Sequence, residues 1–194
     1  MSRVREQLPD DYQKILEVDL QKDKKIALGL NLSSVVIGVL MGWGGHQVVS
    51  ISKLFDFSQG TGMYFLRFAS LLAVMVAYII LHEAVHGIVM KAYGAKKVRY
   101  GFTGLYAFAG TDAYFDKVSY IVVALAPVLF WGMVLLILGF SVPSSWFWVI
   151  YATQILNVSG AAGDAYVTVR FWHLPADILV HDHGTGMAVY SKTK

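Results

Sequence analysis

The sequence predicts an all-α membrane protein with four transmembrane helices and both termini in the cytoplasm. Three observations predict this fold class. Of the 194 residues, 56% are hydrophobic and only 15% are charged, which is far from the composition of a soluble domain. Residues 118–163 contain no Asp, Glu, Lys, Arg or His. Basic residues are concentrated in alternate connections between the apolar runs, as in multi-pass membrane proteins.

Each predicted helix corresponds to an apolar run of about 20 residues, the length that crosses a bilayer. The charge-free stretch is long enough for two such helices, with a tight turn around Pro143 between them. We therefore expect one membrane domain over residues 1–194. It consists of a charged N-terminal segment, four spans and a C-terminal tail, at residues 1–25, 26–49, 64–93, 118–140, 145–169 and 170–194.

Two stretches outside the spans have the pattern of small cytoplasmic β-hairpins. Between the second and third spans, aromatic-rich runs at 98–102 and 105–109 flank Thr103 and Gly104. In the tail, residues 178–190 have a turn sequence at 184–186. The edge of the first hairpin could hold an unfolded peptide by strand addition, or the hairpin could simply cover what lies beneath it.

The distribution of basic residues predicts the orientation in the membrane. They precede the first span and separate the second from the third, whereas the connection between the first two spans holds only Lys53. By the positive-inside rule, both termini and the middle connection are cytoplasmic. The basic residues of these two segments are Arg3, Arg5, Lys14, Lys22, Lys24, Lys25, Lys91, Lys96, Lys97, Arg99 and Lys117.

The second predicted span carries the motif His82-Glu83-Ala84-Val85-His86. On a helix the two histidines project from one face a turn apart, so that their ring nitrogens can bind one zinc at about 2.0 to 2.1 Å. Glu83 points to a neighbouring face, where it can take the proton of a zinc-activated water as general base. At about 1.5 Å per residue, His82 lies on the order of 13 Å from the cytoplasmic end of the span. Ionisable groups at such a depth indicate a functional site.

A catalytic zinc needs a third protein ligand and an open position. The chain has no cysteine, so the ligand must be a carboxylate or an imidazole. Asp164 is the carboxylate that falls in a hydrophobic span, at a depth similar to that of His82. The alternative is an Asp at a helix end that faces water or Arg170. His181 and His183 in the tail suggest a second metal site, although polar residues at a turn are the more common case.

Other residues of the later spans could support the site. Asn157 shares a helix face with Asp164. It could donate a hydrogen bond to the substrate or to a developing oxyanion, or it could bond between helices. The small residues at 159–163 allow close backbone approach or local unwinding. Pro127 should kink the third span.

At these residues the chain resembles the intramembrane zinc metalloproteases of the site-2 protease type. Those enzymes carry His-Glu-x-x-His in one span and an Asp in a later span. The short length, the four predicted spans and the polar tail are similar to a family of small bacterial membrane proteins called putative zincin peptidases. The resemblance implies that His82, His86 and Asp164 bind zinc, that Glu83 is the general base, and that the protein is a multi-pass protein of the plasma membrane.

Together these observations predict a zinc-dependent intramembrane metalloprotease that hydrolyses peptide bonds near the cytoplasmic side. Its cofactor would be Zn²⁺, and its substrate a peptide or membrane protein in the lipid bilayer. Two alternatives remain: a zinc hydrolase of another carbonyl substrate, and a non-proteolytic zinc-binding membrane protein for scaffolding or metal handling. No nucleic-acid partner is expected, and the sequence predicts no particular oligomeric state.

Overall fold

The computed structural model describes residues 4–104 and 106–193. Arg3, Leu105 and Lys194, which entered the predictions above, lie outside these residues. The chain divides into two compact units. The sheet unit, as we name it, consists of Met1–Leu30, His82–Pro127 and Gly163–Lys194, and the helical unit consists of Asn31–Leu81 and Val128–Ala162.

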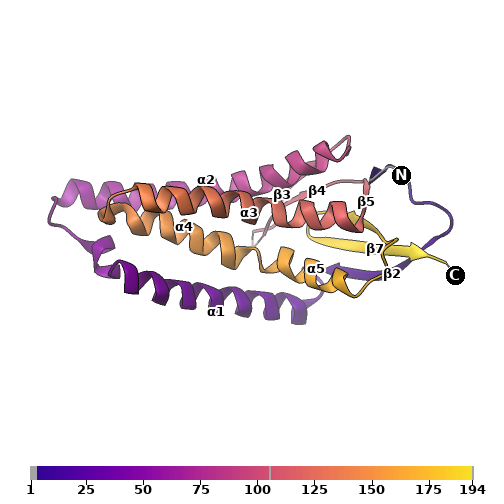
Figure 1. Ribbon diagram of the computed structural model, residues 1–194, viewed down its shortest axis with the longest axis horizontal. Helices are drawn as coiled ribbons and strands as arrows, with labels where there is room; N and C mark the ends of the chain where they lie inside the picture. Colours follow the sequence, from indigo (N-terminus) through magenta and orange to yellow (C-terminus); the bar gives the residue numbers. More distant parts are fainter. Residues whose placement is uncertain (1–3, 105, 194) are drawn as a thin grey trace. The chain divides into compact units, whose positions relative to one another are not determined.

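Among the described residues, three α-helices are long and apolar enough to cross a membrane (Figure 1). Many of their large apolar side chains are exposed, including Leu129 at 67% and Phe140 at 86%. Extended apolar surface of this kind is unfavourable in water and is accommodated by lipid. The helices are α1 (Lys24–Val48), α2 (Thr61–Ala92) and α3 (Lys117–Ser141).

The fourth predicted span, 145–169, is not one continuous helix. A short 3-10 helix, η2 (Ser144–Trp146), leads into α4 (Phe147–Gly160), which is followed by α5 (Ala162–Trp172). The break at Ala161 falls within the predicted run of small residues, where glycine lowers helix stability. It creates a new helix start, and Asp164 lies in the first turn of α5, where the helix dipole favours a negative charge.

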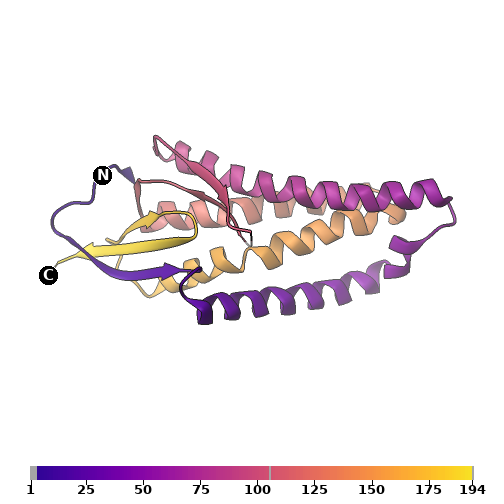
Figure 2. The same cartoon turned by 180° about the vertical axis from the view of Figure 1, so that it is seen from behind.

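The prediction of an all-α fold is wrong, because the described residues also form a five-stranded antiparallel sheet and a two-stranded sheet. The larger sheet has the order β1-β5-β6-β7-β2 and belongs to the sheet unit. Both views show β2 beside β7 (Figures 1 and 2). The strands are β1 (Val4–Arg5), β2 (Tyr12–Asp19), β3 (Arg99–Phe102), β4 (Ala107–Gly110), β5 (Tyr114–Asp116), β6 (Leu179–Asp182) and β7 (Gly186–Lys192).

The strand β2 was not predicted, because the N-terminal segment that contains it is rich in charged residues. In this strand Leu16 and Val18 turn inward, whereas Ile15 and Glu17 are exposed, so the alternation typical of a half-buried strand is present but short. Its partner β7 is at the other end of the chain, with Asp19 opposite Gly186. Local patterns do not reveal a pairing over this sequence distance.

The two predicted hairpin positions do carry paired strands. β3 pairs with β4, and β6 pairs with β7. Gly104 and Gly184 lie in their turns with φ of 91° and 104°, a conformation that glycine adopts without strain. The N–H of Thr111, which directly follows β4, donates to the carbonyl of Asp182 at 2.9 Å. The two hairpins of the sheet unit are therefore joined.

The core of the sheet unit lies between the large sheet and the helix segments of that unit. Phe115, Phe171 and Val180 are 0% exposed there. Met90 of α2 and Val123 of α3 belong to the same cluster. Burial of this apolar area fixes the sheet-unit parts of α2, α3 and α5 with respect to the sheet.

The helical unit is held by bonds between side chains and backbone of different helices. Ser34 of α1 donates to the carbonyl of Ser159 at 2.7 Å. The Tyr151 hydroxyl donates to the carbonyl of Met41 at 3.0 Å, and a Cβ on Gly45 would overlap the Tyr151 ring. Glycine therefore permits the close approach of α1 and α4.

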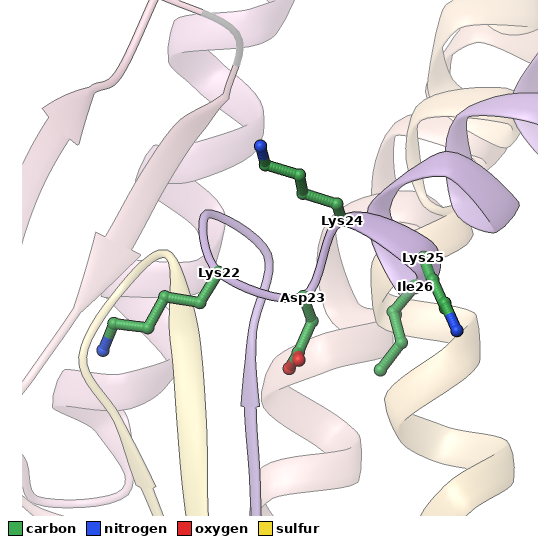
Figure 3. Close-up of a pocket in the computed structure, with 5 residues that line it drawn as sticks. All are labelled: Lys22, Asp23, Lys24, Lys25 and Ile26. Carbon is green, nitrogen blue, oxygen red and sulfur yellow. The ribbon is translucent and has the colours of Figure 1, made fainter.

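A surface pocket lies at the connection between β2 and α1 (Figure 3). Its lining consists of consecutive residues of one short segment, and none of the predicted site residues is among them. The lining residues are Lys22, Asp23, Lys24, Lys25 and Ile26.

Candidate metal centre

Helix α2 presents His82 and His86 to the same side of the sheet unit. The two residues are one turn apart, and their ring centroids are 5.0 Å from each other. Their side chains are only 12% and 11% exposed. The helical spacing predicted this convergence, and the apolar surroundings make a shared ligand favourable.

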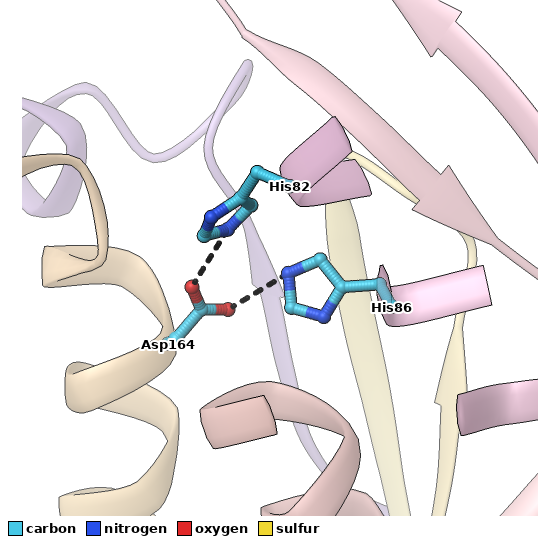
Figure 4. Close-up of side chains that lie close together, drawn as sticks. All are labelled: His82, His86 and Asp164. Carbon is cyan, nitrogen blue, oxygen red and sulfur yellow. Dashed lines mark ion pairs between the residues drawn. The ribbon is translucent and has the colours of Figure 1, made fainter. Parts of the chain in front are cut away.

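Helix α5 brings the Asp164 carboxylate between the two imidazoles (Figure 4). Its Oδ2 lies 3.7 Å from His82 Nε2, and its Oδ1 lies 3.7 Å from His86 Nε2. Among the described residues, these three form the group that could hold a metal ion, with one ligand atom from each and all of them within 4.8 Å of one another.

These distances fit a metal ion better than direct bonding between the side chains. A charge-assisted N–H···O bond is about 2.7 to 2.9 Å long, so contacts of 3.7 Å are too long for strong hydrogen bonds. Ligand bonds of about 2.0 to 2.1 Å in a tetrahedron put neighbouring donor atoms roughly 3.3 Å apart. The two His–Asp distances exceed this separation by a few tenths of an ångström, and two imidazoles with one carboxylate are a donor set that zinc accepts.

Glu83 lies beside this group on α2 and is partly buried. The backbone N–H of Ala109 on β4 lies near its carboxylate. The β3–β4 hairpin therefore packs next to Glu83 as well as next to the large sheet. The sequence predicts a cytoplasmic hairpin at this position, but no pattern in it indicates a contact with the motif.

Tyr100 on β3 is a second contact between the hairpin and the motif. Its hydroxyl lies against the backbone of Gly87, where a Cβ would overlap it. Gly87 directly follows His86 and is one helical turn from Glu83. Gly87 is the feature of the sequence that could have indicated this contact, because a glycine inside a helix often marks the close approach of another segment.

His86 is also held from the side opposite to Asp164. Its Nδ1 lies 2.9 Å from the carbonyl oxygen of Val123 on α3, and both residues are buried. The ring is therefore fixed between a backbone carbonyl and the Asp164 carboxylate.

Asn157 lies in the helical unit and is 0% exposed. The Tyr78 hydroxyl donates to its Oδ1 at 2.8 Å, and its Nδ2 donates to the carbonyl of Val128 at 3.1 Å. Asn157 thus bonds between helices, which was one of its two predicted roles. A role toward substrate stays a prediction.

The tail histidines do not gather with other ligands among the described residues. The His181 ring stacks on Tyr114 at 5.0 Å, and burial lowers the pKa of this histidine. The rings of His181 and His183 are 6.3 Å apart.

Asp182, between these histidines, is partly buried, which the polar sequence around it does not suggest. It accepts hydrogen bonds from the Tyr120 hydroxyl at 2.6 Å and from the N–H of Gly184 at 2.8 Å. Burial raises the pKa of Asp182 to about 6, although both hydrogen bonds favour the ionised form.

A helix-borne His-Glu-x-x-His motif with a carboxylate from a second helix defines a candidate zinc centre of the zincin kind. The model of a family described as "Putative zincin peptidase" matches residues 75–179, more than half of the chain, and we conclude that the chain belongs to this family. The matched region contains His82, Glu83, His86 and Asp164, and the family implies a zinc metallopeptidase. No curated protein and no solved structure matches the chain.

Proposed function

We propose that the protein is an intramembrane zinc metalloprotease that hydrolyses peptide bonds near the cytoplasmic side of the membrane. The observation that carries the proposal is the convergence of one ligand atom each from His82, His86 and Asp164, beside Glu83. Family membership supports zinc peptidase chemistry. The resemblance to site-2 proteases supports the intramembrane setting.

His82 and His86 would hold the metal through Nε2, and Asp164 through its carboxylate. Zinc, when bound there, polarises a carbonyl and lowers the pKa of a coordinated water to about 7. Three protein ligands are the number found in catalytic zinc sites, which keep one position for water or substrate.

Glu83 is the proton carrier in this proposal. Its carboxylate accepts a proton from the attacking water as the water oxygen bonds to the peptide carbonyl carbon. The same proton is then donated to the nitrogen of the leaving amine as the C–N bond breaks. In this proposal the nearby N–H of Ala109 helps to orient the carboxylate.

The β3–β4 hairpin is the element that we assign to peptide presentation. The contact of Tyr100 with Gly87 brings the hairpin backbone next to the proposed base, and Ala109 lies near Glu83. A peptide added to this hairpin as a strand would be extended, which exposes a scissile bond.

The membrane setting is supported by the charge-free runs of α2 and α3, which are candidate spans. His82 is nine residues from Lys91, so the motif would lie within the hydrocarbon region on the side of the basic connection. This position predicts substrates that are cleaved within or next to a membrane span.

Replacement of Glu83 by Gln tests the proposal. In proteoliposomes with a model transmembrane substrate, Glu83→Gln should retain its zinc and lose about 10²- to 10⁴-fold in cleavage rate, because the amide cannot take a proton. Glu6→Gln is the matched control, since Glu6 is a half-exposed carboxylate that pairs with Lys96 at 3.6 Å. Cleavage that persists unchanged in Glu83→Gln would contradict the proposal and favour a zinc-binding scaffold.

A further inference from the structure

Pro127 lies inside α3. In an α-helix the N–H of each residue donates to the carbonyl four residues earlier, and proline has no N–H. The carbonyl that loses its donor is therefore that of Val123. A buried carbonyl without a donor is unfavourable, so a replacement donor is expected.

The replacement donor is His86. Its Nδ1 lies 2.9 Å from the Val123 oxygen, and Val123 is 1% exposed. A carbonyl oxygen only accepts hydrogen bonds, so Nδ1 must carry the proton. In the neutral ring the other nitrogen, Nε2, then has a free lone pair. This is the nitrogen that faces Asp164 Oδ1 at 3.7 Å.

We propose that Pro127 is a positioning residue of the metal centre. By withholding an N–H from Val123 it leaves a carbonyl that holds His86 in the tautomer and ring orientation required for zinc ligation through Nε2. The inference rests on the proposed role of His86 as a metal ligand. In this proposal Pro127 does more than bend the helix, because a bend alone would not favour one imidazole tautomer of His86 over the other.

The expected loss of zinc affinity can be estimated from the hydrogen-bond partners of metal-ligating histidines in other proteins. Loss of such a partner typically costs about 10- to 100-fold in metal affinity or activity. In Pro127→Ala the new N–H would bond to the Val123 oxygen and compete with His86. Because a carbonyl has two lone pairs, the competition is partial, and we expect a loss at the lower end, about tenfold.

The test uses the full chain in detergent micelles, labelled with ¹⁵N-histidine and free of metal. The His86 signals are identified by their loss in His86→Ala. At pH 8.5, about two units above the ordinary imidazole pKa, long-range ¹H–¹⁵N correlations report which ring nitrogen carries the proton. Zinc titration of the same samples gives the dissociation constants. Leu129→Ala is the control, because it changes an exposed side chain of α3 and adds no N–H.

The expected result is an Nδ1–H tautomer of His86 in the wild type and a larger Nε2–H fraction in Pro127→Ala, with zinc bound about tenfold more weakly. Leu129→Ala should match the wild type in both readouts. An Nε2–H tautomer in the wild type would overturn the inference without any variant. The inference would also be overturned if Pro127→Ala folds and binds zinc with the wild-type dissociation constant while the separate variant His86→Ala loses zinc. If His86→Ala also binds zinc normally, the proposed ligand set itself fails.

Discussion

Two clusters of polar side chains in the apolar helices differ in how their hydrogen-bonding capacity is used. In the helical unit, Asn157 bonds to Tyr78 and to the Val128 carbonyl at 2.8 and 3.1 Å. In the sheet unit, the facing atoms of Asp164 and the two histidines stay 3.7 Å apart. In the first cluster, Tyr78 and Asn157 are bonded directly to each other. The second presents donor atoms around a common point, which is the arrangement expected of a ligand site.

The difference shows how polar residues in apolar helices can be sorted. Burial alone does not separate the clusters, because Asn157 is 0% exposed and His86 is 9% exposed. Both kinds of residue would be costly in lipid if left unpaired. The separating property is the distance between the side chains: Tyr78 and Asn157 lie within hydrogen-bond distance of each other, whereas Asp164 and the two histidines face one another at 3.7 Å.

The largest expected effect comes from removing a residue of the second cluster. His82→Ala should weaken zinc binding by more than about 100-fold, since loss of a ligand should exceed loss of a ligand's partner. His46→Ala is the matched control, because His46 lies in the helical unit and its Nδ1 accepts the N–H of Ile51 at 3.1 Å. Competition with a fluorescent zinc chelator measures both. If His82→Ala and His46→Ala bind zinc with equal affinity, the second cluster is not the zinc site.

A smaller effect is expected at Asp182, which is in the sheet unit but has its oxygens bonded within the protein. Because its folded pKa is about 6 and its ordinary value 3.8, ionisation is harder in the folded state. Its contribution to stability therefore falls as the pH rises from about 4 to 6 and stays low above that range. Asp182→Asn should be more stable than the wild type at pH 7.5, by up to about 3 kcal/mol, and should lose the advantage at pH 4.

Denaturant unfolding in micelles at pH 4 and pH 7.5 measures this difference. Asp112→Asn serves as the control for removal of a carboxylate, since Asp112 is exposed and pairs with Arg99 at 2.6 Å. An Asp182→Asn variant that is less stable than the wild type at both pH values would show that the partly buried charge is favourable.

The smallest effect is expected from a substitution in the first cluster, that of Asn157 in the helical unit. Asn157→Ala should lower the free energy of unfolding by about 1 to 2 kcal/mol, in the range of hydrogen bonds between membrane helices, and should leave zinc affinity unchanged. Thr153→Ala is the matched control on α4, because its hydroxyl donates to the carbonyl of Val149 in the same helix at 3.1 Å. A large loss of zinc in Asn157→Ala would mean that the two clusters are coupled.

The sequence predicted the parts of the site that depend on spacing along one helix. His82, Glu83 and His86 follow from the motif, and Asp164 follows from being a carboxylate in an apolar run. The structure brings the ligand atoms of the two histidines and Asp164 together. It does so with a break at Ala161 that the small residues only suggested, so that Asp164 begins a helix of its own.

The remaining features depend on contacts between distant segments. β2 and β7 join opposite ends of the chain, and the alternation of Leu16 and Val18 is too short to reveal this among charges. The bond of His86 to Val123 requires knowing which helix lies beside α2. Pro127 predicted a free carbonyl in its own helix, but not which side chain would reach it.

The central claim is that Asp164 completes a zinc site with His82 and His86, and zinc titration of Asp164→Ala beside the wild type tests it most directly. Purified in the same detergent, the wild type should bind one zinc per chain. Asp164→Ala should bind it more than about 100-fold more weakly while retaining its helical content. Zinc binding by Asp164→Ala at wild-type affinity would contradict the account, because the third ligand would then lie elsewhere.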